Sequence, residues 1–209
     1  MIIDNIYINP PAHLRSWVEK RWAMCEQKHK DAWSVPNSFL ETLLTHKDKL
    51  NLTCIDFFVE TGTCQGLTSD IMAKHFSHVY TVEKYVDDER RCLYGELERD
   101  NPNITFCSGD SGNELQRISH EVLGCRCVIL LDAHNGNDSP LAAELSVIKQ
   151  CYNKYCVILV DDACDLGTGT WPDKGTFESL VMDINPDYKI VYTGIGRHIC
   201  LIYPDKNHD

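Results

Sequence analysis

The sequence has no CxxC pair, although it contains eleven cysteines in 209 residues. This spacing argues against a zinc ribbon and a thioredoxin-type motif, and the odd number suits no disulfide framework. Cys125, Cys127 and Cys156 fall in short apolar stretches, where a free thiol behaves as a small buried hydrophobe. These features predict a reducing, cytoplasmic compartment.

Long apolar runs and an excess of basic residues are also missing. No stretch approaches the 18 apolar residues of a membrane span, and the first residues lack the basic and apolar regions of a signal peptide. The net charge of −11 argues against a nucleic-acid partner, since phosphate binding relies on clustered Lys and Arg. The nearest candidates for a basic patch are spread out: Lys20, Arg21, Lys28 and Lys30. We therefore expect a soluble protein without a membrane partner.

From residue 54 the chain alternates regularly between short apolar runs and segments of helical pattern. The apolar runs occupy 55–60, 78–83, 104–107, 126–132, 155–161 and 188–193. The helical patterns occupy 65–75, 86–100, 111–122, 139–151 and 174–184. Continuous apolar strands that alternate with helices predict a parallel sheet covered on both faces.

A seventh apolar run, 197–203, follows the sixth after only Gly194, Ile195 and Gly196. This gap permits a hairpin but no helical crossover, so the last strand should be antiparallel. The predicted fold is an α/β, Rossmann-like doubly wound sheet of seven strands, six parallel and the last antiparallel.

An N-terminal helical extension precedes this sheet in our prediction. Residues 1–50 contain three of the four tryptophans and two expected helices, near 12–30 and 36–47. We divide the chain into a helical cap at 1–50 and the α/β domain at 51–209. The cap either packs on one face of the core or contributes to a substrate pocket.

A glycine-rich turn follows the first apolar run. The segment VETGTCQGLTS, residues 59–69, leads from an expected strand into an expected helix, and such a turn directs backbone N–H groups toward a ligand. Gly62 and Gly66 allow close approach of the backbone to a ligand and to the sheet. Their GxxxG spacing differs from the GxGxxG of dinucleotide sites, and no GK[ST] of a P-loop is present.

Acidic residues end the next two strands. Glu83 lies about 20 residues beyond the turn, where an acid accepts hydrogen bonds from ribose hydroxyls. A solvated Glu beside Lys84 is the alternative. Asp110 stands at the turn after the third strand, and it either receives an adenine amino group or caps the following helix.

Three further acids end the fourth and fifth strands: Asp132, Asp161 and Asp162. Adjacent parallel strands lie about 4.8 Å apart, so the acids at their carboxyl ends meet in one crevice. Neighbouring carboxylates repel one another unless a cation is present, and hard divalent ions prefer oxygen ligands. Simple helix capping is the alternative for Asp162 and for Asp138.

Five motifs thus stand in order at successive strand ends: VETGTCQGLTS, VYTVEKY, ITFCSGDS, VILLDAHNG and VILVDDA. The set resembles class I S-adenosylmethionine (SAM)-dependent methyltransferases, and more narrowly the sugar O-methyltransferases of the FkbM-like and macrocin-type groups. The resemblance covers residues 54–203. The cysteine content, the short length and the motif set also resemble glycan-modifying methyltransferase domains of large DNA viruses of algae.

The resemblance implies that SAM is the methyl donor. SAM carries no pyrophosphate and does not require a third glycine, and Glu60 suits the cationic amino group of its methionine moiety. The expected cofactor-binding residues are Glu60, Thr61, Gly62, Thr63, Gly66, Thr68, Ser69, Glu83, Lys84, Asp110, Ser111 and Asp132.

The resemblance also implies a divalent metal, Mg²⁺ or Mn²⁺, held by Asp132, Asp161 and Asp162. Such a metal binds two vicinal sugar hydroxyls and lowers the pKa of the one to be methylated. His134, two residues beyond Asp132, is the expected general base, because imidazole accepts a proton near neutrality. We therefore assign catalytic roles to His134 and Asp132. Trp171, in a glycine-rich loop, either stacks on a pyranose ring or packs in the core.

The expected function is SAM-dependent O-methylation of a sugar hydroxyl, in a glycan or a deoxysugar such as rhamnose. A catechol-type small-molecule O-methyltransferase and a non-catalytic SAM-fold binding module are the alternatives. The missing third glycine disfavours a nucleotide-dependent oxidoreductase. The expected partners are a small-molecule or glycan acceptor, a second copy in a homodimer, and glycosyltransferases that act with the chain or are fused to it.

Overall fold

The computed structural model describes residues 36–135, 137–193 and 198–205. The strands are β1 (Phe57–Thr61), β2 (His78–Glu83), β3 (Ile104–Ser108), β4 (Cys127–Leu131), β5 (Val157–Val160), β6 (Tyr188–Tyr192) and β7 (Cys200–Pro204). The α-helices are α4 (Pro36–Thr45), α5 (Lys47–Leu50), α6 (Leu67–Met72), α7 (Asp88–Asp100), α8 (Ser111–Glu121), α9 (Leu141–Cys151) and α10 (Lys174–Ile184). Two short 3₁₀ helices, η1 (Leu52–Cys54) and η2 (Ala163–Asp165), complete the described elements.

The seven strands form one sheet in the order β3-β2-β1-β4-β5-β7-β6. The ladders from β3 to β5 are parallel, whereas β7 is antiparallel to both of its neighbours, β5 and β6. The predicted sheet of six parallel strands and a final antiparallel strand is therefore confirmed. Every residue of β4 and β5 is buried, which explains why these strands read as continuous apolar runs.

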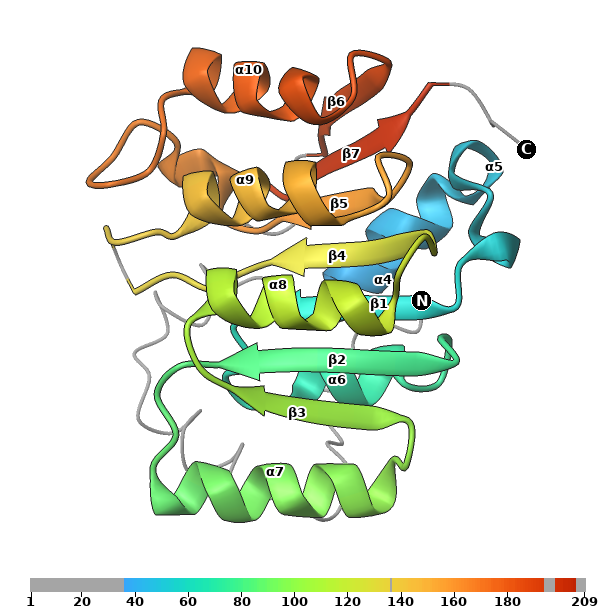
Figure 1. Cartoon of the computed structure of the whole chain (residues 1–209), viewed down its shortest axis with the longest axis vertical. Coiled ribbons are helices and arrows are strands. Elements are labelled where there is room, and N and C mark those ends of the chain that lie inside the picture. Colours follow the sequence, from blue (N-terminus) through green and yellow to red (C-terminus); the bar gives the residue numbers. More distant parts are fainter. Residues whose placement is uncertain (1–35, 136, 194–197, 206–209) are drawn as a thin grey trace.

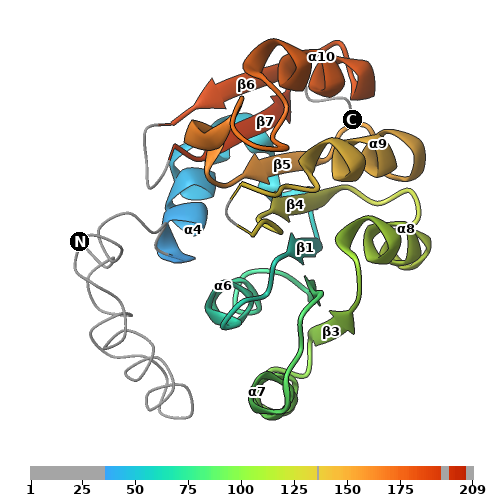
Figure 2. The same cartoon turned by 90° about the vertical axis from the view of Figure 1, so that its left-hand side faces the viewer.

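Helices cover both faces of the sheet. Figures 1 and 2 show α8, α9 and α10 on one face and α4 and α6 on the other, with α7 beside the edge strand β3. One apolar cluster lies under the first layer and includes Ile129, Leu145 and Phe177. A second cluster lies under α4 and α6 and includes Phe39 and Met72. All the strands except β7 run in the same direction, so their carboxyl ends gather at one edge.

Part of the expected N-terminal cap is described. The helix expected near 36–47 begins at Pro36 as α4 and packs against α6. The helix expected near 12–30 and the four scattered basic residues lie outside the described residues, as does the link at 194–197.

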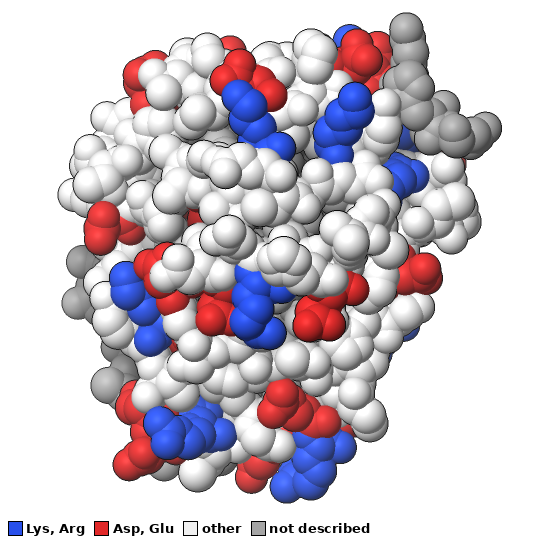
Figure 3. All heavy atoms as spheres, viewed as in Figure 1, with Lys and Arg blue, Asp and Glu red and all other residues white. Residues whose placement is uncertain are grey.

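The charged side chains on the surface are mixed in sign (Figure 3), and the described cysteines form no disulfide bonds. On the face shown in Figure 3, Lys and Arg side chains lie beside Asp and Glu side chains rather than in one continuous basic area. One ion pair of the described residues is Lys149–Asp183, with 3.0 Å between Nζ and Oδ2. The ten cysteines in the described ranges are free; Cys127 and Cys156 are buried as expected, whereas Cys125 is exposed just before β4 begins. Among the described helices, none has both the length and the apolar character to span a bilayer.

Candidate active site

A cavity of about 710 Å³ opens at the carboxyl ends of the strands. It lies where the strand order reverses, between β1 and β4, which is where open α/β sheets bind their ligands. Its wall combines the turn after β1, the ends of β2 and β3, and the segments after β4 and β5. The predicted site residues that line it are Gly62, Thr63, Thr68, Glu83, Lys84, Asp110, Ser111, Asp132, His134, Asp161 and Asp162.

Four of the predicted cofactor-binding residues lie outside the cavity wall. Glu60 and Thr61 are in β1, Gly66 is in the turn, and Ser69 is in α6. Glu60, Thr61 and Ser69 are at most 1% exposed. Glu60 and Ser69 lie beneath the turn, where the Ser69 hydroxyl donates to the Glu60 carboxylate. Thr61 points to the opposite face of the strand, and its hydroxyl group donates to the Leu130 carbonyl oxygen of β4.

The two glycines of the turn have different neighbours. Gly62 has φ +86°, and a Cβ there would overlap the backbone carbonyl oxygen of Asp132. Gly66 has φ +71°, and a Cβ there would meet the Leu97 side chain of α7 at 2.7 Å. Both positions thus favour glycine because of their positive φ, and at Gly62 the backbone of Asp132 also excludes a Cβ, which brings the turn close to the end of β4.

The backbone N–H groups of the turn behave differently from the prediction. We expected them to point toward a ligand. Instead, the N–H groups of Gly62 and Thr63 donate to the Val82 carbonyl oxygen, and that of Gly66 donates to the Thr63 carbonyl oxygen. The N–H of Cys64 donates to the Glu83 carboxylate at 3.0 Å. These four donors are satisfied within the protein, because the turn folds back onto the end of β2.

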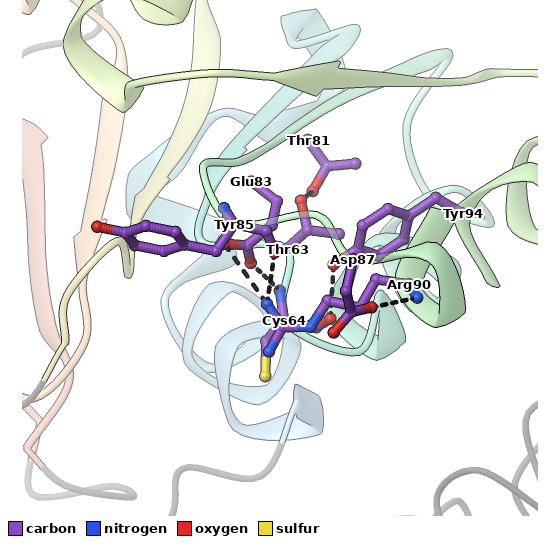
Figure 4. A network of polar contacts seen from close by, with 8 residues as sticks. All are labelled: Thr63, Cys64, Thr81, Glu83, Tyr85, Asp87, Arg90 and Tyr94. Carbon is purple, nitrogen blue, oxygen red and sulfur yellow. Dashed lines mark hydrogen bonds and ion pairs between the residues drawn. The ribbon is translucent and has the colours of Figure 1, made fainter. Parts of the chain in front are cut away.

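Glu83 is a bound carboxylate rather than a solvated one. Its Oε2 accepts from Cys64 and its Oε1 accepts from the Tyr85 N–H at 3.1 Å. Arg90 Nη1 lies 3.8 Å from Oε1, and the side chain is only 12% exposed. The alternative of a solvated Glu beside Lys84 is therefore wrong, and Figure 4 shows how these groups surround the carboxylate.

Asp110 and Lys84 face each other across the cavity mouth. The Lys84 Nζ lies 3.3 Å from Asp110 Oδ2. Asp110 occupies the N-cap position of α8, but its side chain makes no capping hydrogen bond. Side-chain capping is likewise absent for Asp162 ahead of η2, and α9 is preceded by Pro140 rather than by Asp138. The capping alternatives for these aspartates are thus not realised.

Glu60 is buried beneath the turn. Its Oε2 accepts hydrogen bonds from the hydroxyl groups of Ser69 and Thr81. Burial raises the pKa of Glu60 to about 7, although these hydrogen bonds lower it. The carboxyl group therefore takes up a proton on folding across the range from about 4.5 to about 7.

A Glu60→Gln variant should gain stability relative to the unaltered protein as the pH rises from 4.5 to 7. The native pKa lies above the unfolded value, so the stabilising contribution of the protonated acid is present at low pH and is lost as the pH rises. The expected difference grows by about 1.4 kcal/mol per pH unit at most. Urea unfolding of the ligand-free protein at several pH values measures it, with the exposed Glu89→Gln as the matched control. A difference independent of pH would contradict the raised pKa.

The acids after β4 and β5 converge on His134. Its Nε2 lies 3.0 Å from Asp162 Oδ2 and 3.4 Å from Asp132 Oδ1. Burial lowers the pKa of His134, but the hydrogen bonds to both carboxylates outweigh it and raise the pKa to about 10. Burial and the nearby Asp161 raise the pKa of Asp132. Asp162 has φ +50°, a left-handed conformation that turns the chain sharply after β5.

The expected metal ligands are close to one another, but His134 stands between two of them. Carboxylates suit a divalent cation chemically. In the arrangement of the described residues, however, no three His, Cys, Asp or Glu side chains are placed to hold a metal ion. The metal site at Asp132, Asp161 and Asp162 therefore stays a prediction, and we derive no step through it.

Trp171 packs behind His134 instead of lining the cavity. Its side chain is 5% exposed, and its ring centroid lies 5.4 Å from that of His134. The packing alternative for Trp171 is thus confirmed. Beside it, Thr170 joins the two loops after β4 and β5: its N–H donates to the Asn137 carbonyl oxygen at 2.9 Å, and its hydroxyl accepts from the Ser139 N–H at 2.8 Å.

Several residues of the wall carry no sequence signal that we recognised. Phe39 comes from α4, and Tyr85 and Arg90 come from the connection into α7 and its first turn. Asn135 and Ser139 lie in the loop after β4. For Phe39, the sequence shows only a bulky apolar residue in the helix before β1, and this does not predict that the residue lines the cavity.

The strand order and the placement of the cavity define the Rossmann-like fold of class I methyltransferases. No protein-family model matches the sequence. No curated protein matches it significantly either. The fold is therefore established from the structure and from its likeness to solved structures.

Three solved structures illustrate this likeness. A proposed caffeoyl-CoA O-methyltransferase from Staphylococcus aureus is 14% identical, with a TM-score of 0.59 over 97% of each chain. A proposed O-methyltransferase from Klebsiella pneumoniae is 16% identical, with a TM-score of 0.54 over 96% of this chain and 94% of that one. The third is SAM-bound CalS10 from Micromonospora echinaspora, an amino pentose methyltransferase involved in calicheamicin biosynthesis. It is 9% identical, with a TM-score of 0.54 over 90% of this chain and 96% of that one. At such identities the likeness concerns the fold.

Proposed function

We propose that this chain is a SAM-dependent O-methyltransferase that acts on a sugar hydroxyl. One observation carries the proposal: the same cavity is lined by two groups of residues. The glycine turn and Glu83 form one group, and Asp132, His134 and Asp162 form the other. A methyl donor and an acceptor hydroxyl need adjacent sites of this kind. The names of the three solved structures with this fold, two of them O-methyltransferases, support methyl transfer as the reaction.

The turn after β1 suits SAM better than a dinucleotide. A pyrophosphate is bound by free N–H groups of the glycine turn. Here the N–H groups of Gly62, Thr63 and Gly66 donate to backbone carbonyls, and that of Cys64 donates to Glu83. A donor without phosphate has no need of them, and the remaining acceptor capacity of Glu83 is available to ribose hydroxyls.

The proposed proton acceptor is His134. When bound, SAM supplies an electrophilic methyl group, and its sulfonium sulfur is a good leaving group. In its neutral form, the His134 imidazole would accept the proton of the acceptor hydroxyl. Because the pKa of His134 is about 10, this form becomes more abundant as the pH rises towards that value, and the rate of methylation should rise with it. The carboxylates of Asp162 and Asp132 hold His134 in place and stabilise its protonated form.

The acceptor side of the cavity is polar. It is lined by Asn135, Asp138, Ser139, Asp161 and Asp162, whose oxygens accept hydrogen bonds from hydroxyl groups. This lining favours a polyhydroxylated ring, and the likeness in fold to CalS10, an amino pentose methyltransferase, agrees with it. A catechol-like acceptor is the second candidate. It is favoured by the aromatic Phe39 in the wall and by the likeness in fold to the proposed caffeoyl-CoA O-methyltransferase of S. aureus.

Titration calorimetry should show that the protein binds SAM and not NAD. SAM binding is expected because the cavity offers the strand-end acid Glu83, whereas the N–H groups of Gly62, Thr63, Cys64 and Gly66 already donate within the protein. Failure to bind SAM would overturn the proposed function. Binding of NAD alone would favour an oxidoreductase instead.

Formation of S-adenosylhomocysteine across rhamnosides, other deoxysugars and catechols then identifies the acceptor class. Turnover with catechols alone would replace the sugar by the second candidate, and SAM binding without turnover would favour the binding module. Repeating the assay with added Mg²⁺, Mn²⁺ or EDTA tests the metal separately, and full activity in EDTA would remove it from the proposal. The homodimer and the association with glycosyltransferases remain predictions.

A further inference from the structure

Cys64, in the middle of the cofactor turn, has a backbone conformation that needs support. Its φ of +48° lies in the left-handed region, which is unfavourable for a non-glycine residue. Both backbone polar groups of Cys64 are held by side chains. The N–H donates to Glu83 Oε2 at 3.0 Å, and the carbonyl oxygen accepts from the Tyr94 hydroxyl at 2.8 Å. Figure 4 shows Tyr94 and Glu83 on different sides of this peptide segment.

One face of α7 provides this support. Arg90, Tyr94 and Leu97 are spaced by four and three residues, so they lie on the same side of the helix. Arg90 Nη1 donates to the Tyr85 carbonyl oxygen at 2.8 Å and lies 3.8 Å from Glu83. Leu97 lies against the turn at Gly66, where a Cβ would come within 2.7 Å of the Leu97 Cδ2 atom.

Tyr94 is well placed to act as a fixed donor. The side chain is 2% exposed, and its ring stacks on Phe106 of β3 with 4.2 Å between centroids. Burial raises the pKa of Tyr94, so the phenol keeps its proton at any ordinary pH. The stacked ring has little freedom, and the direction of the hydroxyl toward Cys64 is therefore fixed before any ligand binds.

We propose that α7 sets the affinity of the site for SAM, with Tyr94 and Arg90 as positioning residues. Tyr94 holds the turn at Cys64, and Arg90 holds Glu83, the carboxylate expected to accept the ribose hydroxyls. Cys64, Glu83 and Arg90 all line the cavity, whereas Tyr94 acts only through Cys64. The inference rests on the proposed function, and it assigns a role to a helix outside the predicted site residues.

Tyr94→Phe tests the inference because it removes only the hydroxyl and keeps the stacked ring. We expect the Kd and the KM for SAM to rise about tenfold, the equivalent of one lost hydrogen bond, with kcat retained. Tyr152→Phe is the matched control. The Tyr152 hydroxyl also donates to a backbone carbonyl oxygen, that of Leu115, at 2.9 Å, and this residue does not line the cavity. Both variants should lose similar thermal stability.

A second pair of variants separates an effect on SAM binding from a general loss of stability. Arg90→Met should also weaken SAM binding, whereas Arg126→Met should not, although Arg126 also donates to two backbone carbonyl oxygens, those of Tyr155 and Leu50. Equal SAM affinity of Tyr94→Phe and Tyr152→Phe, or of Arg90→Met and Arg126→Met, would overturn the inference. If the unaltered protein binds no SAM, the proposed function itself fails, and this is seen before any variant is measured.

Discussion

Replacement of His134 by glutamine is expected to lower kcat for methyl transfer by roughly 10²–10⁴-fold, the range for loss of a general base. The imidazole Nε2 is the group that both Asp132 and Asp162 hold, at 3.4 and 3.0 Å. Glutamine keeps a polar side chain but accepts no proton, whereas His134, with a pKa of about 10, accepts one in its neutral form. The comparison is therefore made at alkaline pH. SAM affinity should change little, because the glycine turn and Glu83 are untouched. Single-turnover rates together with calorimetric SAM titrations make the comparison.

His120→Gln is the matched control for this change. His120 lies in the last turn of α8, is exposed and does not line the cavity. The double variant His134→Gln with Asp162→Asn should be hardly slower than His134→Gln alone, since residues that act as a unit are not additive. Normal kcat in His134→Gln would show that another group removes the proton.

Gly62→Ala should weaken SAM binding by roughly 100-fold and destabilise the fold by about 2–4 kcal/mol. The backbone at Gly62 has φ +86°, and a Cβ would come within 2.7 Å of the carbonyl carbon of Asp132. The turn after β1 must therefore move away from the end of β4. Because Asp132 also belongs to the acceptor side, both halves of the cavity shift together. Urea unfolding and SAM titration measure the two effects.

Gly95→Ala is expected to stabilise the protein, whereas Gly62→Ala is expected to destabilise it. Gly95 lies in α7 with an ordinary helical conformation, and a Cβ there meets nothing within 4 Å. Alanine should stabilise the protein by about 0.5–1 kcal/mol and leave SAM affinity unchanged. Equal stability of the Gly62→Ala and Gly95→Ala variants would mean that the turn relaxes without cost.

The sheet was predictable because its strands are buried on both faces. In β4 and β5 every residue is buried, so the sequence shows uninterrupted apolar runs whose ends carry the site acids. The reversal of direction at β7 followed from the short connection after β6: residues 193–199 are too few for a helical crossover, although the sequence suggested a gap of only three residues. The convergence of Asp132, His134 and Asp162 likewise followed from the rule that parallel strands end at one edge.

The rest of the site depends on packing that a single sequence does not encode locally. Glu60 reads as a ligand-binding acid, but alternation along β1 and the inner side of α6 place it beneath the turn with Ser69. Nothing in the pattern around Tyr94 distinguishes a core tyrosine from one that holds Cys64. The satisfied N–H groups of the turn arise from its contact with Val82 on the neighbouring strand.

The hydrogen bonds of Thr170 have a consequence for protein engineering. They connect the loop after β4 to the loop after β5, and Gly169 is close enough to Asn137 that a Cβ would come within 2.9 Å of its carbonyl carbon. A graft that exchanges one of these loops with that of another methyltransferase would leave its partner without a matching surface. New acceptor preferences should therefore be transplanted as a two-loop cassette that spans both segments.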